Sequence, residues 1–241
     1  MRTRTRESSP LTKPYSAVMT RGLQEWRQQI GSVTTAAIRG TALEQALGAT
    51  PEQRLAFATT FADDAGHRRP VDLPLLAWVL RLGDSPGSAP STAADRPDLG
   101  LWRALQTAAD DPHTLIATST GPIAPECRGE GIEVWTEVEL ACLHALWWHA
   151  ALRDSESLRD RAEDHARWLM DEIQPDNGTN HAWAVAAFAE LAAAGESDAA
   201  LYAETLLHNC QVTLGKADRF SAVLLVDASR YLDRLIADDP R

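Results

Sequence analysis

The chain has 241 residues, of which 44% are hydrophobic and 24% are charged, and its formal net charge is −11. This length and balance are typical of one large globular domain, or of one domain with a smaller appendage. No apolar run reaches the roughly 20 residues that cross a bilayer, so no membrane span is expected. The acidic charge repels phosphate backbones, so nucleic acid is not expected as the main partner.

Both the N-terminal segment and the cysteines bear on location. Residues 1–14, MRTRTRESSPLTKP, are basic but have no apolar segment behind them. This pattern differs from a secretory signal and predicts a disordered basic tail. The three cysteines form neither a CxxC pair nor a disulfide framework; they are Cys127, Cys142 and Cys210. We therefore expect free thiols, which are typical of the reducing cytoplasm.

Apolar residues recur at helical spacing through the first third of the chain. One stripe predicts an amphipathic helix and consists of Met19, Leu23, Trp26 and Ile30. Another helix is predicted over 33–47. A third is predicted to begin at Pro51 with Thr50 as its cap, and a fourth surrounds Pro74 in VDLPLLAWVLRL.

The segment 83–97, GDSPGSAPSTAADRP, is rich in Gly, Pro and Ser and poor in large apolar residues. It predicts a flexible linker between an N-terminal helical region, 15–82, and a C-terminal helical-hairpin domain, 98–241. After a short helix around 99–109, residues 110–132 lack a helical period, and TLIATST is the one place there for a short strand. Long irregular segments of this kind are typical of functional loops or of disorder, and the sequence assigns no role to this one.

The remaining 110 or so residues predict a regular series of helices. Thr136 and Glu139 form a capping box that predicts a helix start, and Thr179 and Asp218 are the predicted caps of two later helices. Gly195 is the predicted left-handed end of one of them. Short connections make consecutive helices antiparallel, so the predicted fold class is all-α, built from antiparallel helical hairpins. Helix starts recur roughly every 40 residues, as in helical-repeat bundles.

Hairpins of this length, rich in Ala, Leu and Trp, with DNG at a corner and HAWAV opening the next helix, resemble the α/α-toroid group. That group includes the terpenoid-cyclase-like proteins and the helical-barrel glycoside-processing enzymes. The resemblance covers about residues 135–235 and implies a partial α/α-toroid architecture. The DxDD motif of the protonating terpenoid cyclases is absent, so the resemblance carries no activity over to this chain.

The corner QPDNGTNHAW holds the first candidate site, with Asp176, Asn177, Asn180 and His181 within six residues. Turn chemistry alone accounts for such residues, because Asn and Gly adopt positive φ and Asp binds nearby amides. The alternative is a ligand site at a helix N-terminus, where the dipole favours a neutral His181 that acts as a base or metal ligand. The sequence leaves both interpretations open.

Two further pairs of acid and histidine share helix faces. Glu137 and His144 are two turns apart, about 10 Å along the axis, so they do not chelate one ion unaided. Their alternatives are an acid favoured by the helix dipole and a buried, hydrogen-bonded histidine. Glu204 and His208 have the i, i+4 spacing of a two-ligand metal site, which is also the spacing of an ordinary surface pair.

Trp135 and Trp183 stand near helix starts and are candidates for a pocket mouth, although most of the eight tryptophans are expected in the core. The helix starts near 137, 180 and 218 are expected at one end of the stack. This would bring five side chains to one rim: Glu137, Asp176, Asn177, His181 and Arg219. His144 would then form the floor of a cleft. Such a rim suits a divalent metal or a polar small molecule.

Two classes of function follow from these observations. The first is a helical scaffold or interaction protein that binds a protein partner, favoured because Walker A, GxGxxG, HExxH and GxSxG motifs are absent. The second is an enzyme or a small-ligand or metal-binding protein, with a polar Glu/His/Asp cleft at helix N-termini. A divalent metal is the one candidate cofactor, and the sequence indicates neither substrate nor oligomeric state.

Overall fold

The computed structural model describes residues 17–83, 96–107, 111–116, 118–173 and 179–238. Every regular element within these ranges is helical, so the predicted all-α fold class is confirmed. The basic tail expected at 1–14 and most of the linker expected at 83–97 lie outside the described residues. The predicted strand in TLIATST is wrong over its described residues, because the chain forms the 3-10 helix η1 (Pro112–Leu115) where that strand would begin.

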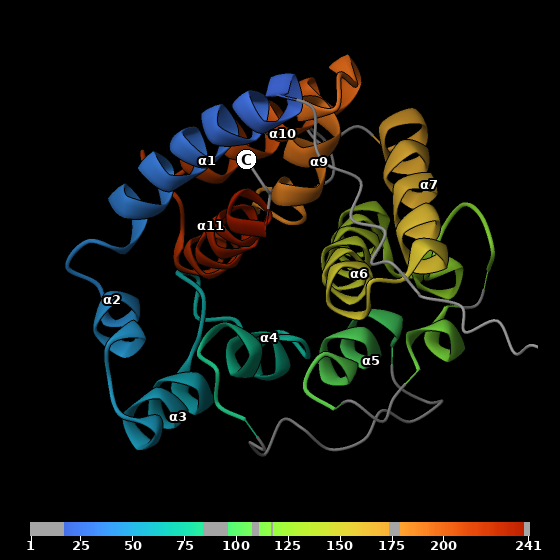
Figure 1. Cartoon of the computed structure of the whole chain (residues 1–241). Helices are drawn as coiled ribbons and strands as arrows, with labels where there is room; N and C mark the ends of the chain where they lie inside the picture. The colour runs from blue at the N-terminus through green and yellow to red at the C-terminus, as the bar shows by residue number, and fades with distance from the viewer. Residues whose placement is uncertain (1–16, 84–95, 108–110, 117, 174–178, 239–241) are drawn as a thin grey trace, which may run out of the picture.

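The described chain begins with one long helix, continues through shorter helices as far as residue 130 and then consists mainly of long helices; Figure 1 shows α6 and α11 nearly end-on near the middle of the molecule. The predicted helix over 33–47 is divided between the end of α1 and all of α2. The helices besides η1 are α1 (Ala17–Ile38), α2 (Ala42–Leu47), α3 (Pro51–Thr60), α4 (Asp72–Val79), α5 (Pro97–Ala104), η2 (Pro125–Glu130), α6 (Ile132–Arg153), α7 (Glu156–Glu172), α9 (Val185–Ala193), α10 (Ser197–Val212) and α11 (Arg219–Asp238).

One hydrophobic core joins the N-terminal and C-terminal halves of the chain. Helix α1 packs along α11 and α9, and α4 packs against both α5 and α11. Leu23 and Ile30 of α1 and Leu224 of α11 are all buried in this core. The expected regions 15–82 and 98–241 therefore share one core and do not have one each.

Local capping signals set several helix ends as predicted. Thr50 caps α3 in a capping box with Gln53. At the start of α11, Oδ1 of Asp218 accepts the N–H groups of Phe220 at 2.8 Å and Ser221 at 2.9 Å. Gly195 follows α9 with a φ of +106°, a conformation that glycine adopts without strain.

The predicted capping box at Thr136 is wrong, because α6 begins one turn earlier, at Ile132. Glu139 therefore lies inside the helix, fully buried, and its carboxylate points into the core. There it accepts the backbone N–H groups of Ile123 at 2.8 Å and Ala124 at 3.0 Å. Glu139 thus accepts hydrogen bonds from backbone groups of another segment and does not cap its own helix. The residues next to Glu139 in the sequence do not indicate this tertiary contact.

The predicted cap at Thr179 is also wrong. Helix α9 begins only at Val185, after Ala184 in the left-handed conformation. Thr179 Oγ1 instead accepts the N–H of His181 at 2.9 Å, closing a short turn ahead of the helix. His181 consequently lies outside the first turn of α9, and the dipole argument for a neutral imidazole no longer applies to it.

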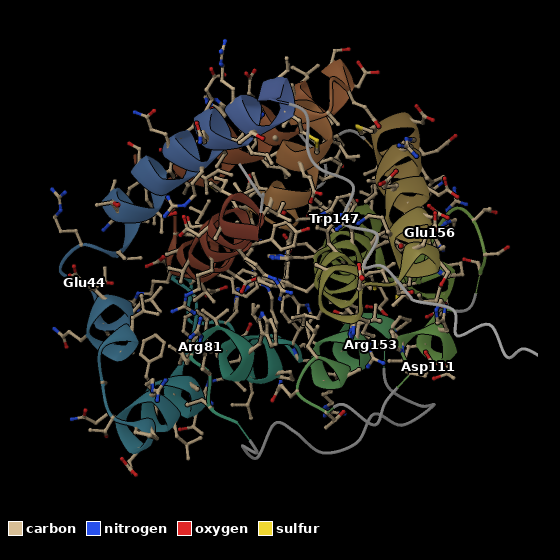
Figure 2. The ribbon with its side chains drawn as sticks, viewed as in Figure 1. Glu44, Arg81, Asp111, Trp147, Arg153 and Glu156 are labelled. Carbon is tan, nitrogen blue, oxygen red and sulfur yellow. The ribbon has the colours of Figure 1, made fainter. Side chains whose placement is uncertain are left out.

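Tryptophans pack in the core as expected, and several also donate to buried carboxylates. The indole N–H of Trp147 donates to Glu190 at 2.7 Å, and that of Trp135 donates to Glu139 at 2.9 Å. In Figure 2, Trp147 lies in the interior beside α6, whereas Glu44 projects from the outer edge of α2. An indole is well suited to this role because it covers a large apolar area and still offers one donor.

The described helices bear on the expected lack of a membrane span, and the structure also places the three cysteines. None of these helices is both long enough and apolar enough to span a membrane. Cys127, Cys142 and Cys210 are buried free thiols, as expected. Burial raises the pKa of the Cys210 thiol to about 12, so this thiol is unreactive.

Candidate functional site

Asp227 of α11 is a buried carboxylate, only 2% exposed, that meets three N–H donors. Its Oδ1 accepts the indole N–H of Trp78 at 3.0 Å. Its Oδ2 accepts the indole N–H of Trp148 at 2.5 Å and lies 3.0 Å from Nε2 of His144. Burying a carboxylate is costly unless hydrogen bonds replace its water, and here donors from α4 and α6 do so.

His144, the expected floor of a cleft, is enclosed behind Asp227. Its Nδ1 lies 3.3 Å from the backbone N–H of Ala184, so the hydrogen-bond pattern assigns the proton to Nε2, which donates to Asp227. The rings of Trp102 and Trp183 meet the imidazole edge to face, with centroids 5.2 and 5.9 Å away. His144 is 2% exposed, so it affects the space beyond Asp227 only through that carboxylate.

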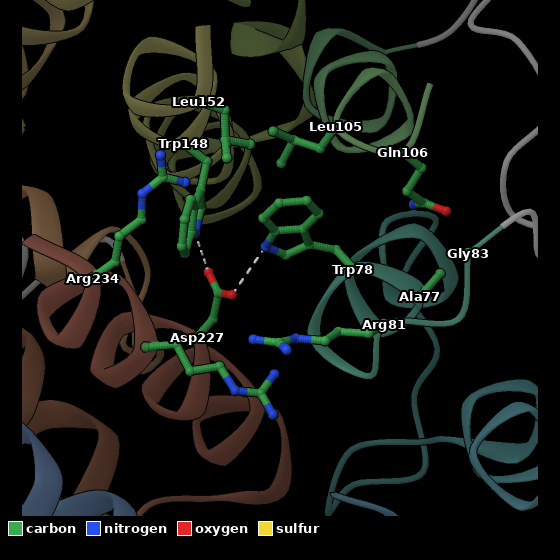
Figure 3. A pocket seen from close by; sticks show the side chains of 11 residues that line it. Ala77, Trp78, Arg81, Gly83, Leu105, Gln106, Trp148, Leu152, Asp227 and Arg234 are labelled. Carbon is green, nitrogen blue, oxygen red and sulfur yellow. Dashed lines mark hydrogen bonds between the residues drawn. The ribbon is translucent and has the colours of Figure 1, made fainter. Parts of the chain in front are cut away.

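A cavity of about 610 Å³ opens on the other side of Asp227, between α4, α5, α6 and α11. Pockets of this size hold small organic molecules. Figure 3 shows the indoles of Trp78 and Trp148 on either side of the Asp227 carboxylate, with Leu105 and Leu152 beyond them. The pocket therefore has an aromatic and aliphatic wall next to one carboxylate whose two oxygens are already hydrogen-bonded.

Three arginines line the same pocket: Arg81, Arg230 and Arg234. Among the described residues that line the pocket, Asp227 is the one acidic side chain, so this part of the lining carries a net positive charge, although the chain as a whole carries −11. Burial lowers the pKa of the Arg230 guanidinium, and the nearby charge of Arg81 lowers it further, while Asp227 opposes both. At Arg230, therefore, burial and the neighbouring positive charge both disfavour the charged form, and Asp227 offsets them only in part.

Arg81 occupies a backbone position that usually belongs to glycine. Helix α4 ends in a Schellman motif, in which Leu82 N–H bonds Ala77 O at 2.9 Å and Arg81 N–H bonds Trp78 O at 3.1 Å. Arg81 has a φ of +53°, which costs a side-chain-bearing residue about 1 kcal/mol. In Figure 3 its side chain extends from the end of α4 towards Asp227. Backbone strain of this kind is common at functional sites, where it helps to position a side chain that binds or reacts.

Glu137 and His181 form a second polar cluster, at the start of α6. Glu137 Oε1 lies 2.5 Å from His181 Nδ1, and Oε2 accepts the indole N–H of Trp183 at 2.8 Å. Arg69 Nη2 lies 3.1 Å from His181 Nε2, and Thr179 donates to Glu137. Both carboxylate oxygens accept hydrogen bonds, and Nδ1 of His181 faces Glu137; Nε2 accepts from Arg69 only when it is unprotonated, and Asp218 lies 4.0 Å from it. The cluster is thus a junction between α6, the turn before α9 and the loop before α4.

The pKa values of this pair move apart. Burial raises the pKa of Glu137, but the hydrogen bond and charge of His181 outweigh it, and the net shift is downward from 4.5. Burial lowers the pKa of His181, but the hydrogen bond and charge of Glu137 outweigh it, and the net shift is upward from 6.5. The charged pair is consequently most stabilising between these two ordinary values.

We predict that the stability supplied by His181 is fully present below its ordinary pKa of 6.5 and is lost as pH rises through its raised value. Melting temperatures of the wild type and His181→Gln, measured between about pH 5 and pH 9, should therefore converge as pH rises. His208→Gln, at an exposed position of α10, is the matched control and should follow the wild type. A constant difference between His181→Gln and the wild type across this range would contradict the prediction.

The other expected site residues are dispersed. Glu204 and His208 are both exposed on α10, and Asn180 is exposed in the turn before α9. Arg219 pairs with Asp64 at 3.2 Å, and the residue before it, Asp218, lies 4.0 Å from Nε2 of His181, so Arg219 borders the Glu137 cluster. Within the described ranges, no group of three or more His, Cys, Asp or Glu side chains could hold a metal ion.

The two tryptophans expected at a pocket mouth, Trp135 and Trp183, lie elsewhere in the core. Trp135 is buried and donates to Glu139, and Trp183 is buried and donates to Glu137, so neither lines the pocket beside Asp227. Asp176 and Asn177 lie outside the described residues. The two interpretations of the corner QPDNGTN therefore both stay open.

The residues around the pocket were missed by the sequence analysis, although one signal was present. Asp227, Arg230 and Arg234 fall at i, i+3 and i+7, on one face of the last helix, which adjoins the apolar face that contains Phe220 and Tyr231. Trp78 and Arg81 come from a helix 150 or so positions earlier, so no local pattern joins them to Asp227. Comparisons of this chain with protein-family models, with curated proteins and with solved structures give no match.

Proposed function

We propose that this protein binds a small organic molecule in the pocket beside Asp227. The observation that carries the proposal is the cavity of about 610 Å³ whose wall is formed by Trp78 and Trp148. Ligand sites are typically concave, mostly apolar and fitted with a few polar groups. Asp227 holds both indoles in place through hydrogen bonds of 3.0 and 2.5 Å, so the wall is formed before a ligand arrives.

This proposal develops the second function class, a small-ligand binder, and moves its site from the helix N-termini to the pocket between α4 and α11. No reaction is proposed, because both oxygens of Asp227 already accept hydrogen bonds. The scaffold hypothesis has weaker support. The exposed large hydrophobic side chains of the described residues are distributed over α1, α6, α10 and the turn after α10, and they include Val18, Leu152, Leu201 and Leu214.

Two coarser proposals accompany it. The partial α/α-toroid architecture is supported by neighbouring helix pairs, because α6 packs against α7 and α9 packs against α10. It carries no activity with it. A cytoplasmic location is supported by the three buried free thiols, which fit a reducing compartment.

The test compares the wild type with one variant that fills the pocket and one that does not. Leu152→Trp adds a large ring to an exposed residue of the pocket lining, whereas Leu201→Trp makes the same change at an exposed position of α10. The probe is a panel of neutral and charged naphthalene derivatives, observed by ligand NMR and thermal shift. We expect binding to the wild type and to Leu201→Trp, and at least tenfold weaker binding to Leu152→Trp. If no probe binds the wild type saturably, the proposal is wrong.

A further inference from the structure

Most charged side chains of the described lining are guanidinium donors, and Oε1 of Gln106 is a buried acceptor without a hydrogen-bond partner. Asp227, the one carboxylate among the described lining residues, already accepts from two indoles and faces His144. Arg230 uses Nη1 to bind the carbonyl oxygen of Val79, and a guanidinium carries five N–H donors in all. A ligand that satisfies the guanidinium groups must therefore supply acceptors, and Oε1 of Gln106 has room for one donor from the same ligand.

Arg81 is the cation best placed to meet such a ligand. Its side chain is exposed at the pocket, and within the described part of the chain its guanidinium has no hydrogen-bond or ion-pair partner. Arg230 is more deeply buried, and the positive charge of Arg81 helps to lower the pKa of its guanidinium. An anion between the two guanidinium groups would relieve that repulsion and form charge-assisted hydrogen bonds with both.

We infer that the ligand of this pocket carries an anionic oxygen group, a carboxylate or a phosphate, bound by Arg81 and Arg230. Its apolar or aromatic body lies against Trp78 and Trp148. The inference rests on the proposed function and adds the ligand class to it. It also requires that cations of the same shape are rejected, because three arginines surround the space.

The apolar part of the inference follows from the rest of the lining. Ala77, Leu105 and Leu152 contribute only carbon atoms from their side chains, and the two indole N–H groups are directed at Asp227. A small inorganic anion would leave this surface in contact with water. An anion with a hydrophobic body covers the apolar wall and reaches the guanidinium groups at the same time.

Three matched probes separate charge from shape: naphthaleneacetate, naphthyl phosphate and the neutral naphthaleneacetamide. Their dissociation constants are measured by calorimetry with the wild type, Arg81→Asn, Arg81→Lys and Arg68→Asn. Asparagine tolerates the left-handed backbone at position 81, so Arg81→Asn should melt at the wild-type temperature or above it. Arg68 is exposed in the loop before α4, outside the pocket, and serves as the control.

We expect the wild type and Arg68→Asn to bind at least one anion ten or more times more tightly than the amide. Arg81→Asn should remove about tenfold of anion affinity without changing that of the amide, and Arg81→Lys should be intermediate, because it keeps the charge but loses the planar fork. The preferred anion distinguishes a carboxylate from a phosphate ligand. Equal binding of anions and amide, unchanged in Arg81→Asn, would overturn this inference and leave the proposed function standing. Failure of all three probes, together with the wider panel, would overturn the proposed function itself.

Discussion

Replacing Asp227 by asparagine is expected to lower the free energy of unfolding by about 3 kcal/mol. The carboxylate meets three N–H donors, from Trp78, Trp148 and His144. An asparagine side chain has one acceptor oxygen, and its NH₂ group would face at least one of these N–H groups in a site that is only 2% exposed at Asp227. The loss is measured by urea denaturation, read as a change in midpoint at constant slope.

The matched control lies on the same helix. Asp233 of α11 pairs with Arg27 at 2.7 Å, and its side chain is 57% exposed, so Asp233→Asn should cost less than about 1 kcal/mol. Both substitutions remove one negative charge from α11, so a difference between their effects on the free energy of unfolding reports the burial and hydrogen bonds of Asp227 and not the loss of charge. Equal effects of the two substitutions would show that the Asp227 hydrogen bonds contribute nothing specific.

Much of the fold could be predicted from the sequence because its signals are local. The stripe with Leu23 and Ile30, the box at Thr50 and the cap at Asp218 each depend on residues within one or two turns. The predictions at Thr136 and Thr179 failed where a side chain with good capping chemistry lies close to a buried group from another segment. Helix boundaries are decided by tertiary hydrogen bonds at such places.

The pocket could not be predicted for a related reason. Its residues come from α4, α5, α6 and α11, and only the folded chain brings Trp78 beside Asp227. In the sequence, the candidate site residues were histidines and polar residues near helix starts, because titratable side chains of these types often take part in catalysis or binding. The histidine that matters most here, His144, holds Asp227 in place from the buried side and does not reach the pocket itself.

The second large effect is expected from Glu139→Gln, which changes a buried carboxylate of α6. Glu139 is fully buried and accepts N–H groups from Ile123 at 2.8 Å, Ala124 at 3.0 Å and the indole of Trp135 at 2.9 Å. A glutamine offers one acceptor and adds donors of its own, so the free energy of unfolding should again fall by about 3 kcal/mol. Glu163→Gln is the control, because Glu163 of α7 is a partly exposed partner of Arg167 at 3.1 Å.

Hydrogen exchange can show whether this carboxylate holds a local segment or the whole fold. The residues before α6 have few regular backbone bonds, and side chains replace them: Arg161 donates to the carbonyl oxygen of Thr118 at 3.1 Å and to that of Gly121 at 2.9 Å. If Glu139 fixes this segment alone, Glu139→Gln will speed exchange at the Ile123 and Ala124 amides far more than in α11. If exchange rises equally in the segment and in α11, the segment unfolds together with the core. Unchanged protection at both amides would contradict the prediction, because their hydrogen-bond acceptor would then be dispensable.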